Sequence, residues 1–229
     1  MGQQNKKVIG ILGGMGPDAT ITLFHRIVAQ TRAEREQDHL PIIVDNNPAI
    51  PDRTRALLEG GPNPVPFLKE SVQRLQKAGA EVIGMPCNTA HAFLAEIRKD
   101  LKVPFVDMVG LTQDQPGFKD RNYFLLATRG TIKAGIYSGL QIPEKSFQER
   151  IQALIYGVKA GENLVEKQLE LKGIINIIRE KDGGVVLGCT ELSFLYWPPY
   201  NKPLFKDDGF VIDPLNLLAQ ELIRAAGLN

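Results

Sequence analysis

Six short apolar runs constrain the fold of this chain more than any other feature of its sequence. Helix-length amphipathic segments separate them, and a Gly, Pro or polar residue follows most of them closely. The runs are Val8–Leu12, Pro41–Val44, Val82–Met85, Val103–Val106, Tyr123–Ala127 and Val185–Leu187. Continuous apolar strands that alternate with helices are typical of parallel sheets covered on both faces. The sequence therefore predicts an α/β fold.

Three of the intervening segments carry the signals of helices. One helix is predicted over Pro64–Ala78, because its apolar residues share one face and Gly79 follows at a position that favours a left-handed residue. A second is predicted over Asn163–Glu180, where leucines and isoleucines recur at helical spacing. The last helix is predicted over Pro214–Ala226.

The two halves of the chain repeat one layout. In the first half, a strand leads into a glycine-rich turn and a later strand delivers Cys87. In the second half, a strand leads into a polar turn and a later strand delivers Cys189. Open parallel sheets bind ligands just outside the carboxyl ends of their strands. We therefore expect one cysteine on each wall of a cleft.

This repetition predicts two pseudo-symmetric parallel-sheet α/β domains that face each other across the cleft. The first domain comprises residues 1–110 together with the C-terminal helix, residues 212–229. The second comprises residues 111–211, and the link between them falls within Met108–Gly117. A chain of 229 residues is long enough for each half to bury its own core.

Composition excludes several classes of protein. With 27 basic and 26 acidic residues, the chain lacks the excess of positive charge that nucleic acids and anionic membranes select. The first apolar run is too short for a signal peptide or a membrane span. Two cysteines do not make a disulfide framework. We expect a cytoplasmic protein whose partner is a small molecule.

The two cysteines are the strongest candidates for chemistry. A lone cysteine is usually a small buried hydrophobe, but two in matching contexts at strand ends favour a functional pair. No CxxC, HExxH or histidine cluster accompanies them, so no metal site is predicted. Helix-forming sequence after Cys87, from Ala90 to Lys99, predicts a helix N-terminus that would favour a thiolate.

Two opposed thiols suit the inversion of a carbon atom that carries an acidic hydrogen. One thiolate removes the proton from one face while the other thiol returns a proton to the opposite face. Asn88 and Thr89 beside Cys87, and Thr190 beside Cys189, are short hydrogen-bonding side chains that suit a bound carboxylate. His91 follows Cys87 by four residues, but the two-base scheme does not need it.

The glycine-rich turn at Gly14–Ala19 supports a rival interpretation. Its Gly-x-Gly-x-x-Ala spacing after a strand is formally a dinucleotide-binding fingerprint. The acidic residue expected at the end of the next strand is poorly placed, since Asp45 lies 29 residues after Gly16. We prefer a backbone-amide cradle for a small carboxylate. A tight turn without a ligand and a nucleotide-dependent oxidoreductase or binding protein remain alternatives.

Six motifs in order resemble the aspartate racemase branch of the aspartate/glutamate racemase family. They are Ile9–Pro17, Asn46–Thr54, Met85–His91, Leu125–Thr131, Ile155–Gly161 and Gly188–Glu191. The resemblance covers nearly the whole chain. It implies a two-domain α/β racemase that uses neither pyridoxal phosphate nor a metal and is commonly a homodimer.

The resemblance also implies roles for residues. Cys87 and Cys189 become the two acid/base residues, and Asn88, Thr89 and Thr190 hold the substrate's α-carboxylate and α-amine. Arg53 and Lys159 pair with the side-chain carboxylate of a dicarboxylic amino acid such as aspartate. The residues expected to line the cleft beside these are Met15 and Thr131.

The sequence differs from other branches of the family at specific positions, and several substrates and reactions remain as alternatives. The glutamate branch usually carries Asp-Ser in the first turn and Cys-Thr-His in the last motif, where this chain has Gly-Gly-Met-Gly and Cys-Thr-Glu. Some relatives replace the first cysteine by threonine, whereas this chain keeps both cysteines. The motifs do not separate aspartate from glutamate or a broader range. Hydantoin racemase, maleate isomerase and decarboxylase chemistry are further alternatives.

Overall fold

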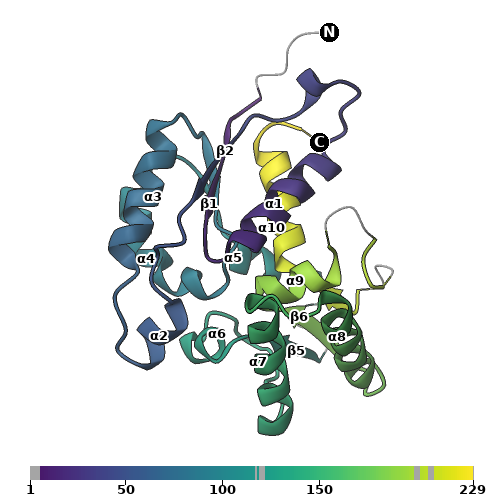
Figure 1. The fold of residues 1–229 in the computed structure, drawn as a ribbon. Helices are drawn as coiled ribbons and strands as arrows, with labels where there is room; N and C mark the ends of the chain where they lie inside the picture. Colours follow the sequence, from purple (N-terminus) through teal and green to yellow (C-terminus); the bar gives the residue numbers. More distant parts are fainter. Residues whose placement is uncertain (1–5, 117, 119–121, 199–201, 206–208, 229) are drawn as a thin grey trace.

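The computed structural model describes residues 6–116, 118, 122–198, 202–205 and 209–228. It contains two parallel sheets with helices packed against them (Figure 1). The predicted two-domain α/β class is therefore confirmed. The terminal residues 1–5 and 229 of the first predicted domain lie outside the described residues, as do residues 117, 119–121, 199–201 and 206–208 of the second.

The first sheet has the strand order β2-β1-β3-β4, all parallel. Its strands are β1 (Ile9–Gly13), β2 (Ile42–Asn46), β3 (Val82–Gly84) and β4 (Phe105–Val106). Ile11 pairs with Val44 on one side and with Gly84 on the other. Strand β1 is buried along its whole length because it is central and covered on both faces.

The second sheet has the order β5-β6-β7, also parallel. Its strands are β5 (Tyr123–Leu126), β6 (Gly184–Leu187) and β7 (Val211–Ile212). An isolated parallel bridge joins Phe124 of β5 to Gln141 and takes the place that β2 has beside β1. Strand β6 precedes Cys189 and lies beside β5. In the same way, β3 precedes Cys87 and lies beside β1. Strand β7 was not among the predicted strands.

Helices occupy most of the remaining described chain. The α-helices are α1 (Pro17–Gln30), α2 (Arg53–Leu58), α3 (Val65–Lys77), α4 (Leu94–Ile97), α5 (Met108–Gln113), α6 (Arg129–Ala134), α7 (Lys145–Lys159), α8 (Leu164–Arg179), α9 (Thr190–Tyr196) and α10 (Pro214–Ala225). Short 3-10 helices are η1 (Glu36–Asp38), η2 (Thr89–Phe93) and η3 (Arg98–Asp100).

The three predicted helices correspond to α3, α8 and α10, and each observed end lies within one residue of its predicted position. Gly79 after α3 has a φ of 98° and so takes the left-handed conformation predicted for it. Asn163 caps α8 by accepting from the amides of Val165 and Glu166. Asp213 caps α10 in the same way through the amide of Leu215.

The segment after Cys87 is not the long helix that was predicted over Ala90–Lys99. It forms η2, the four-residue α4 and then η3. The N-cap position Asn88 makes no capping hydrogen bond, because its side-chain oxygen accepts from Tyr137 instead. A strong helix dipole at Cys87 is therefore not part of this site.

Two further expectations need revision in detail. The predicted link contains helix α5, which Asp107 caps and which packs against α10, while Gly117 lies outside the described residues. The Pro- and aromatic-rich sequence of Phe194–Pro203 predicts a packed loop, but the segment begins with the last turn of α9. Its residues 199–201 lie outside the described residues.

The first sheet is covered on both faces. Helix α3 lies on one side, and α1 and α10 lie together on the other, although α10 ends the chain (Figure 1). Gly84 lets α10 approach the sheet, because a Cβ there would meet Leu222 at 2.8 Å. The second sheet is covered by a core from α7, α8 and α9. The exact division of the chain into two domains stays a prediction.

In the part of the chain that the structure describes, no helix is long and apolar enough to cross a membrane.

A buried arginine joins the two halves of the molecule. The Arg26 guanidinium, on α1, donates to Asp213 at 2.6 Å and to the carbonyl oxygen of Ser193 in α9 at 2.8 Å. It also lies 5.1 Å from the centre of the Trp197 ring. Arg26 is only 1% exposed, so its positive charge depends on these partners.

We expect Arg26→Met to lower the free energy of unfolding by about 3–5 kcal/mol, because it leaves the Asp213 carboxylate buried without its cation. Chemical denaturation monitored by circular dichroism measures this loss. Arg35→Met is the matched control, since Arg35 also pairs with an aspartate, Asp38, but its side chain is 73% exposed. Equal losses in the two variants would contradict the prediction.

Candidate active site

Both cysteines lie just past the carboxyl end of a strand and line one cavity. Cys87 follows β3 by three residues, and Cys189 follows β6 by two. The cavity volume is about 20 Å³, which is room for about one water molecule. Its lining residues are Met15, Asp52, Arg53, Thr54, Cys87, Asn88, Thr89, Thr128, Lys159, Gly188, Cys189, Thr190 and Glu191.

The structure brings together all the predicted site residues except Thr131 at this cavity. Thr131 lies behind the wall, 1% exposed, with its hydroxyl 2.7 Å from that of Thr89. Thr128, which the sequence analysis missed, lines the cavity in its place and caps α6. Thr89 belongs to the first half of the chain and Thr128 and Thr131 to the second, so their hydroxyls join the two walls.

His91 supports the main chain of the wall that carries Cys87. His91 lies with Nδ1 2.8 Å from the carbonyl oxygen of Cys87. Burial lowers the pKa of His91, although that hydrogen bond and Asp107 act in the opposite sense. His91 therefore supports the backbone of Cys87 rather than its sulfur.

Tyr137 fixes the orientation of Asn88. The tyrosine hydroxyl donates to Oδ1 of Asn88, whose side chain is 3% exposed. Nδ2 of Asn88 is buried and has no hydrogen-bond partner among the described residues. Since Asn88 lines the cavity, its amide group is available to a substrate oxygen.

The Cys189 wall carries charge. The Cys189 thiol donates to Oε2 of Glu191 at 2.8 Å, and Nζ of Lys159 lies 3.7 Å from Oε1 of the same carboxylate. Burial and the negative charge of Glu191 raise the pKa of the Cys189 thiol, while Lys159 acts in the opposite sense. Burial alone would lower the pKa of Lys159, but Glu191 and the two cysteines raise it above its usual value.

Arg53 begins α2 and is held by main-chain oxygens. Its guanidinium donates to the carbonyl oxygens of Ile50, Pro51 and Met15. Nε is buried and has no partner, and no carboxylate of the described residues forms an ion pair with it. The group is thus oriented at the cavity with its charge still available to an anion.

One amide of the turn Gly14–Ala19, where a cradle for a carboxylate was expected, is not free. The Gly14 amide donates to Oγ1 of Thr20 at 2.9 Å, so it is already satisfied. Gly14 has a φ of 90°, and a Cβ there would meet the backbone of Asn47 at 2.3 Å. The glycine is therefore explained by close packing, and the turn contributes the side chain of Met15 to the cavity.

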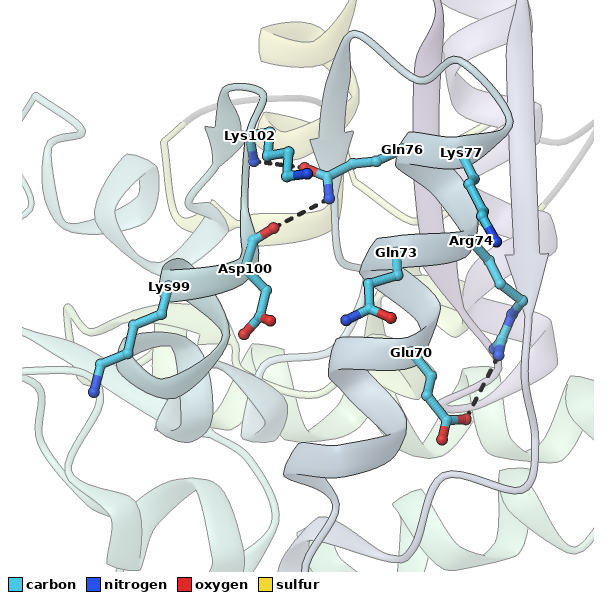
Figure 2. A pocket seen from close by; sticks show the side chains of 8 residues that line it. All are labelled: Glu70, Gln73, Arg74, Gln76, Lys77, Lys99, Asp100 and Lys102. Atoms are coloured by element: carbon cyan, nitrogen blue, oxygen red, sulfur yellow. Dashed lines mark hydrogen bonds and ion pairs between the residues drawn. The ribbon is translucent and has the colours of Figure 1, made fainter.

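A wider groove of about 790 Å³ lies away from the cysteines, between α3 and the segment around η3 (Figure 2). Lysines and an arginine line it, but Arg74 forms ion pairs with Asp45 and Glu70. The amide of Gln76 bridges the main chain of Asp100 and Lys102. Neither cysteine lines this groove, so it lies apart from the candidate catalytic groups.

Several residues of the site were not predicted. Asp52 and Thr54 flank Arg53, and Glu191 follows Cys189 by two residues, so each stood within a recognised motif. Tyr137 gave no sequence signal because it reaches Asn88 across 49 residues of chain. Among the described residues, no group of three or more His, Cys, Asp or Glu could hold a metal ion.

Comparison with known proteins agrees with the α/β fold. The family model for Asp/Glu/hydantoin racemases matches residues 12–222, so the chain belongs to that family. It is therefore an enzyme of the isomerase class, in a family that acts on amino acids.

Individual relatives agree with this assignment. The aspartate racemase of Picrophilus torridus is 32% identical, with a TM-score of 0.80 over 97% of this chain and 95% of that one. A broad specificity amino-acid racemase of Bacillus subtilis (strain 168) is 25% identical over 81% of this chain and 86% of its own length. The glutamate racemase of Thermus thermophilus shares the fold at 21% identity, with a TM-score of 0.61 over 99% and 84% of the two chains.

We expect Tyr137→Phe to raise KM for the amino-acid substrate by roughly 2- to 10-fold, because Asn88 loses the hydrogen bond that orients it. Steady-state kinetics measure the effect. Tyr123→Phe is the control, since it also loses a hydroxyl hydrogen bond, to Gly209, but lies outside the cavity lining. The same rise in KM in both variants would mean that Tyr137 acts only through general stability.

Proposed function

We propose that this enzyme interconverts L- and D-aspartate by a two-base mechanism in which Cys87 and Cys189 exchange the roles of base and acid. The observation that carries the proposal is the single small cavity that both thiols line together with Arg53 and Lys159. Each thiol comes from a different sheet, as a reaction on opposite faces of one carbon requires. The two cations suit a substrate with two carboxylates.

The proton balance of the reaction is simple. The thiolate on one wall takes the α-proton and becomes a thiol, which leaves the electron pair of the C–H bond on Cα. The thiol on the other wall gives its proton to the opposite face of that carbon and becomes a thiolate. The product is the other enantiomer, and the reverse reaction restores the first protonation state.

The walls can also stabilise the carbanion. Asn88, Thr89 and Thr190 supply hydrogen-bond donors for the α-carboxylate, where negative charge grows as the proton leaves. Arg53 and Lys159 would bind the side-chain carboxylate. Because the cavity is smaller than any amino acid, the walls must separate to admit substrate and close again to exclude water.

Glutamate or broad specificity is the alternative within the same mechanism. The Bacillus subtilis relative is named for broad specificity, and one methylene group changes discrimination by only about 1–3 kcal/mol. A panel of L-amino acids and dicarboxylates, extended to a hydantoin and maleate, separates these possibilities. Two cations at the cavity favour dicarboxylates over neutral side chains.

The direct test of the function is exchange of the α-proton of L-aspartate in deuterated buffer, followed by NMR, with chiral chromatography of the same samples. Deuterium at Cα together with D-aspartate supports the proposal. Exchange with another amino acid alone would keep the mechanism and change the substrate. No exchange with any substrate would overturn the proposal.

Replacing either cysteine by alanine should lower the rate of racemisation by roughly 10²- to 10⁴-fold, because each enantiomer needs both the base and the acid. The formation of D-aspartate from L-aspartate, and the reverse, measure this loss. Substrate binding should survive in both variants, as calorimetry can show. Undiminished racemisation by Cys189→Ala would refute the two-base mechanism.

Arg53→Lys should raise KM for aspartate by roughly 10- to 100-fold, because lysine keeps the charge but not the planar fork that binds a carboxylate. The control is Arg55→Lys on the same helix, where the side chain is 69% exposed and pairs with Glu59. Initial rates over a range of aspartate concentrations separate KM from kcat. An unchanged KM in Arg53→Lys would remove Arg53 from the substrate site.

Three expectations about the whole protein remain predictions. They are a cytoplasmic location, assembly as a homodimer, and catalysis without a cofactor or metal. The resemblance to the family carries the last two.

A further inference from the structure

Glu191 occupies an unusual place for a carboxylate, since it lines a catalytic cavity beside a thiol. It is 8% exposed, and both of its oxygens are engaged. Oε2 accepts from the thiol of Cys189 at 2.8 Å and from the hydroxyl of Thr190 at 3.4 Å, and Oε1 lies 3.7 Å from Nζ of Lys159. The carboxylate therefore bridges the thiol and the ammonium group.

Among the described residues, no carboxylate on the opposite wall forms a hydrogen bond with its thiol. Asn88 and Thr89, which follow Cys87, are both neutral, and His91 contacts only the main chain of Cys87. Within the described residues, no side chain forms a hydrogen bond with the sulfur of Cys87. Asp52 also lines the cavity, but its side chain accepts from the amide of Arg55 as the cap of α2. The two thiols thus lie in electrostatically different settings.

Other charged groups around Cys189 do not remove this difference. Lys159, at the end of α7, favours a thiolate, but Glu191 contacts the sulfur directly and shares the charge of the ammonium group. Arg53 lies across the cavity on α2. On the elements packed behind α9, Arg26 and Asp213 neutralise each other. A thiolate at Cys189 would therefore form next to a buried carboxylate, which costs free energy.

We propose that Glu191 holds the proton on Cys189, so that the resting enzyme meets its substrate with Cys189 as the acid and Cys87 as the base. This inference rests on the proposed two-base function. Glu191 acts through the cysteine and is a positioning residue. One enantiomer reacts directly with the resting state, whereas the other needs the proton first moved from Cys189 to Cys87.

The first test titrates each thiol by the ultraviolet absorbance of its thiolate, after subtraction of the Cys87→Ala/Cys189→Ala protein. In a Cys87→Ala background, Glu191→Gln should lower the pKa of Cys189, because it removes a negative charge and supplies an amide donor. Glu191→Asp, which keeps the charge, should largely retain the high value. An unchanged titration of Cys189 in Glu191→Gln would overturn the proposal.

Two controls show whether the effect is specific. In a Cys189→Ala background, Glu191→Gln should leave the titration of the Cys87 thiol unchanged. Glu162→Gln removes a carboxylate that pairs with Lys167 and is 53% exposed, so it should not alter Cys189. Equal shifts at both thiols would indicate a general disturbance of the cavity and would count against the proposal.

The second test uses the intact enzyme with both enantiomers. The equilibrium constant between enantiomers is one, so kcat/KM must be equal in the two directions. When the two enantiomers bind their own protonation states equally well, a preferred resting state gives unequal KM values with kcat values unequal in the same ratio. This ratio should change in Glu191→Gln and stay the same in Glu162→Gln, and an unchanged ratio in Glu191→Gln would overturn the proposal.

The two tests separate failure of the inference from failure of the proposed function. The thiol titration needs no turnover, so it reports on Glu191 even if aspartate is not the substrate. Loss of the proton exchange described above would reject the function alone. A normal exchange reaction with an unresponsive Cys189 would reject the inference alone.

Discussion

The Arg26 guanidinium joins three helices on which both walls of the cavity depend. Helix α1, which carries it, begins just after the turn that contributes Met15. Ser193 lies in α9, which begins directly after Cys189, and Asp213 caps α10. A buried guanidinium requires well-placed acceptors, since its charge is costly to leave unpaired. The contact therefore restricts how the two halves lie across the cavity between Cys87 and Cys189.

The two cations at the cavity, Arg53 and Lys159, differ in how far their charge is already neutralised, and this difference suits the proposed racemisation of a dicarboxylic amino acid. Arg53 is held by neutral carbonyl oxygens and keeps its charge available, whereas Lys159 shares its charge with Glu191. A bound side-chain carboxylate would compete with Glu191 for Lys159. Substrate binding and the protonation of Cys189 would then be coupled through one ammonium group. Under the proposed function, such a coupling would link the recognition of a dicarboxylate to the acid–base chemistry.

Much of the fold could be predicted from local patterns. The six apolar runs form six of the seven strands of the described chain, and three helices end close to their expected residues. The failures have physical causes. Strand β7 has two residues and is stabilised by its pairing with β6, which no local pattern reveals. The segment after Cys87 favoured a helix by composition, but the side chain of Asn88 bonds Tyr137 instead of capping one.

The sequence by itself determined the fold class, the family and the two cysteines at strand ends, because these follow from periodicity and contiguous motifs. Only the tertiary structure decided which polar groups meet at the cavity. In that structure Thr131 lies behind Thr89, the Gly14 amide donates to Thr20, and the Tyr137 hydroxyl donates to Asn88. It also set the Cys189 thiol against the Glu191 carboxylate. These contacts depend on side-chain direction and on the approach of distant segments, and neither is encoded in local spacing.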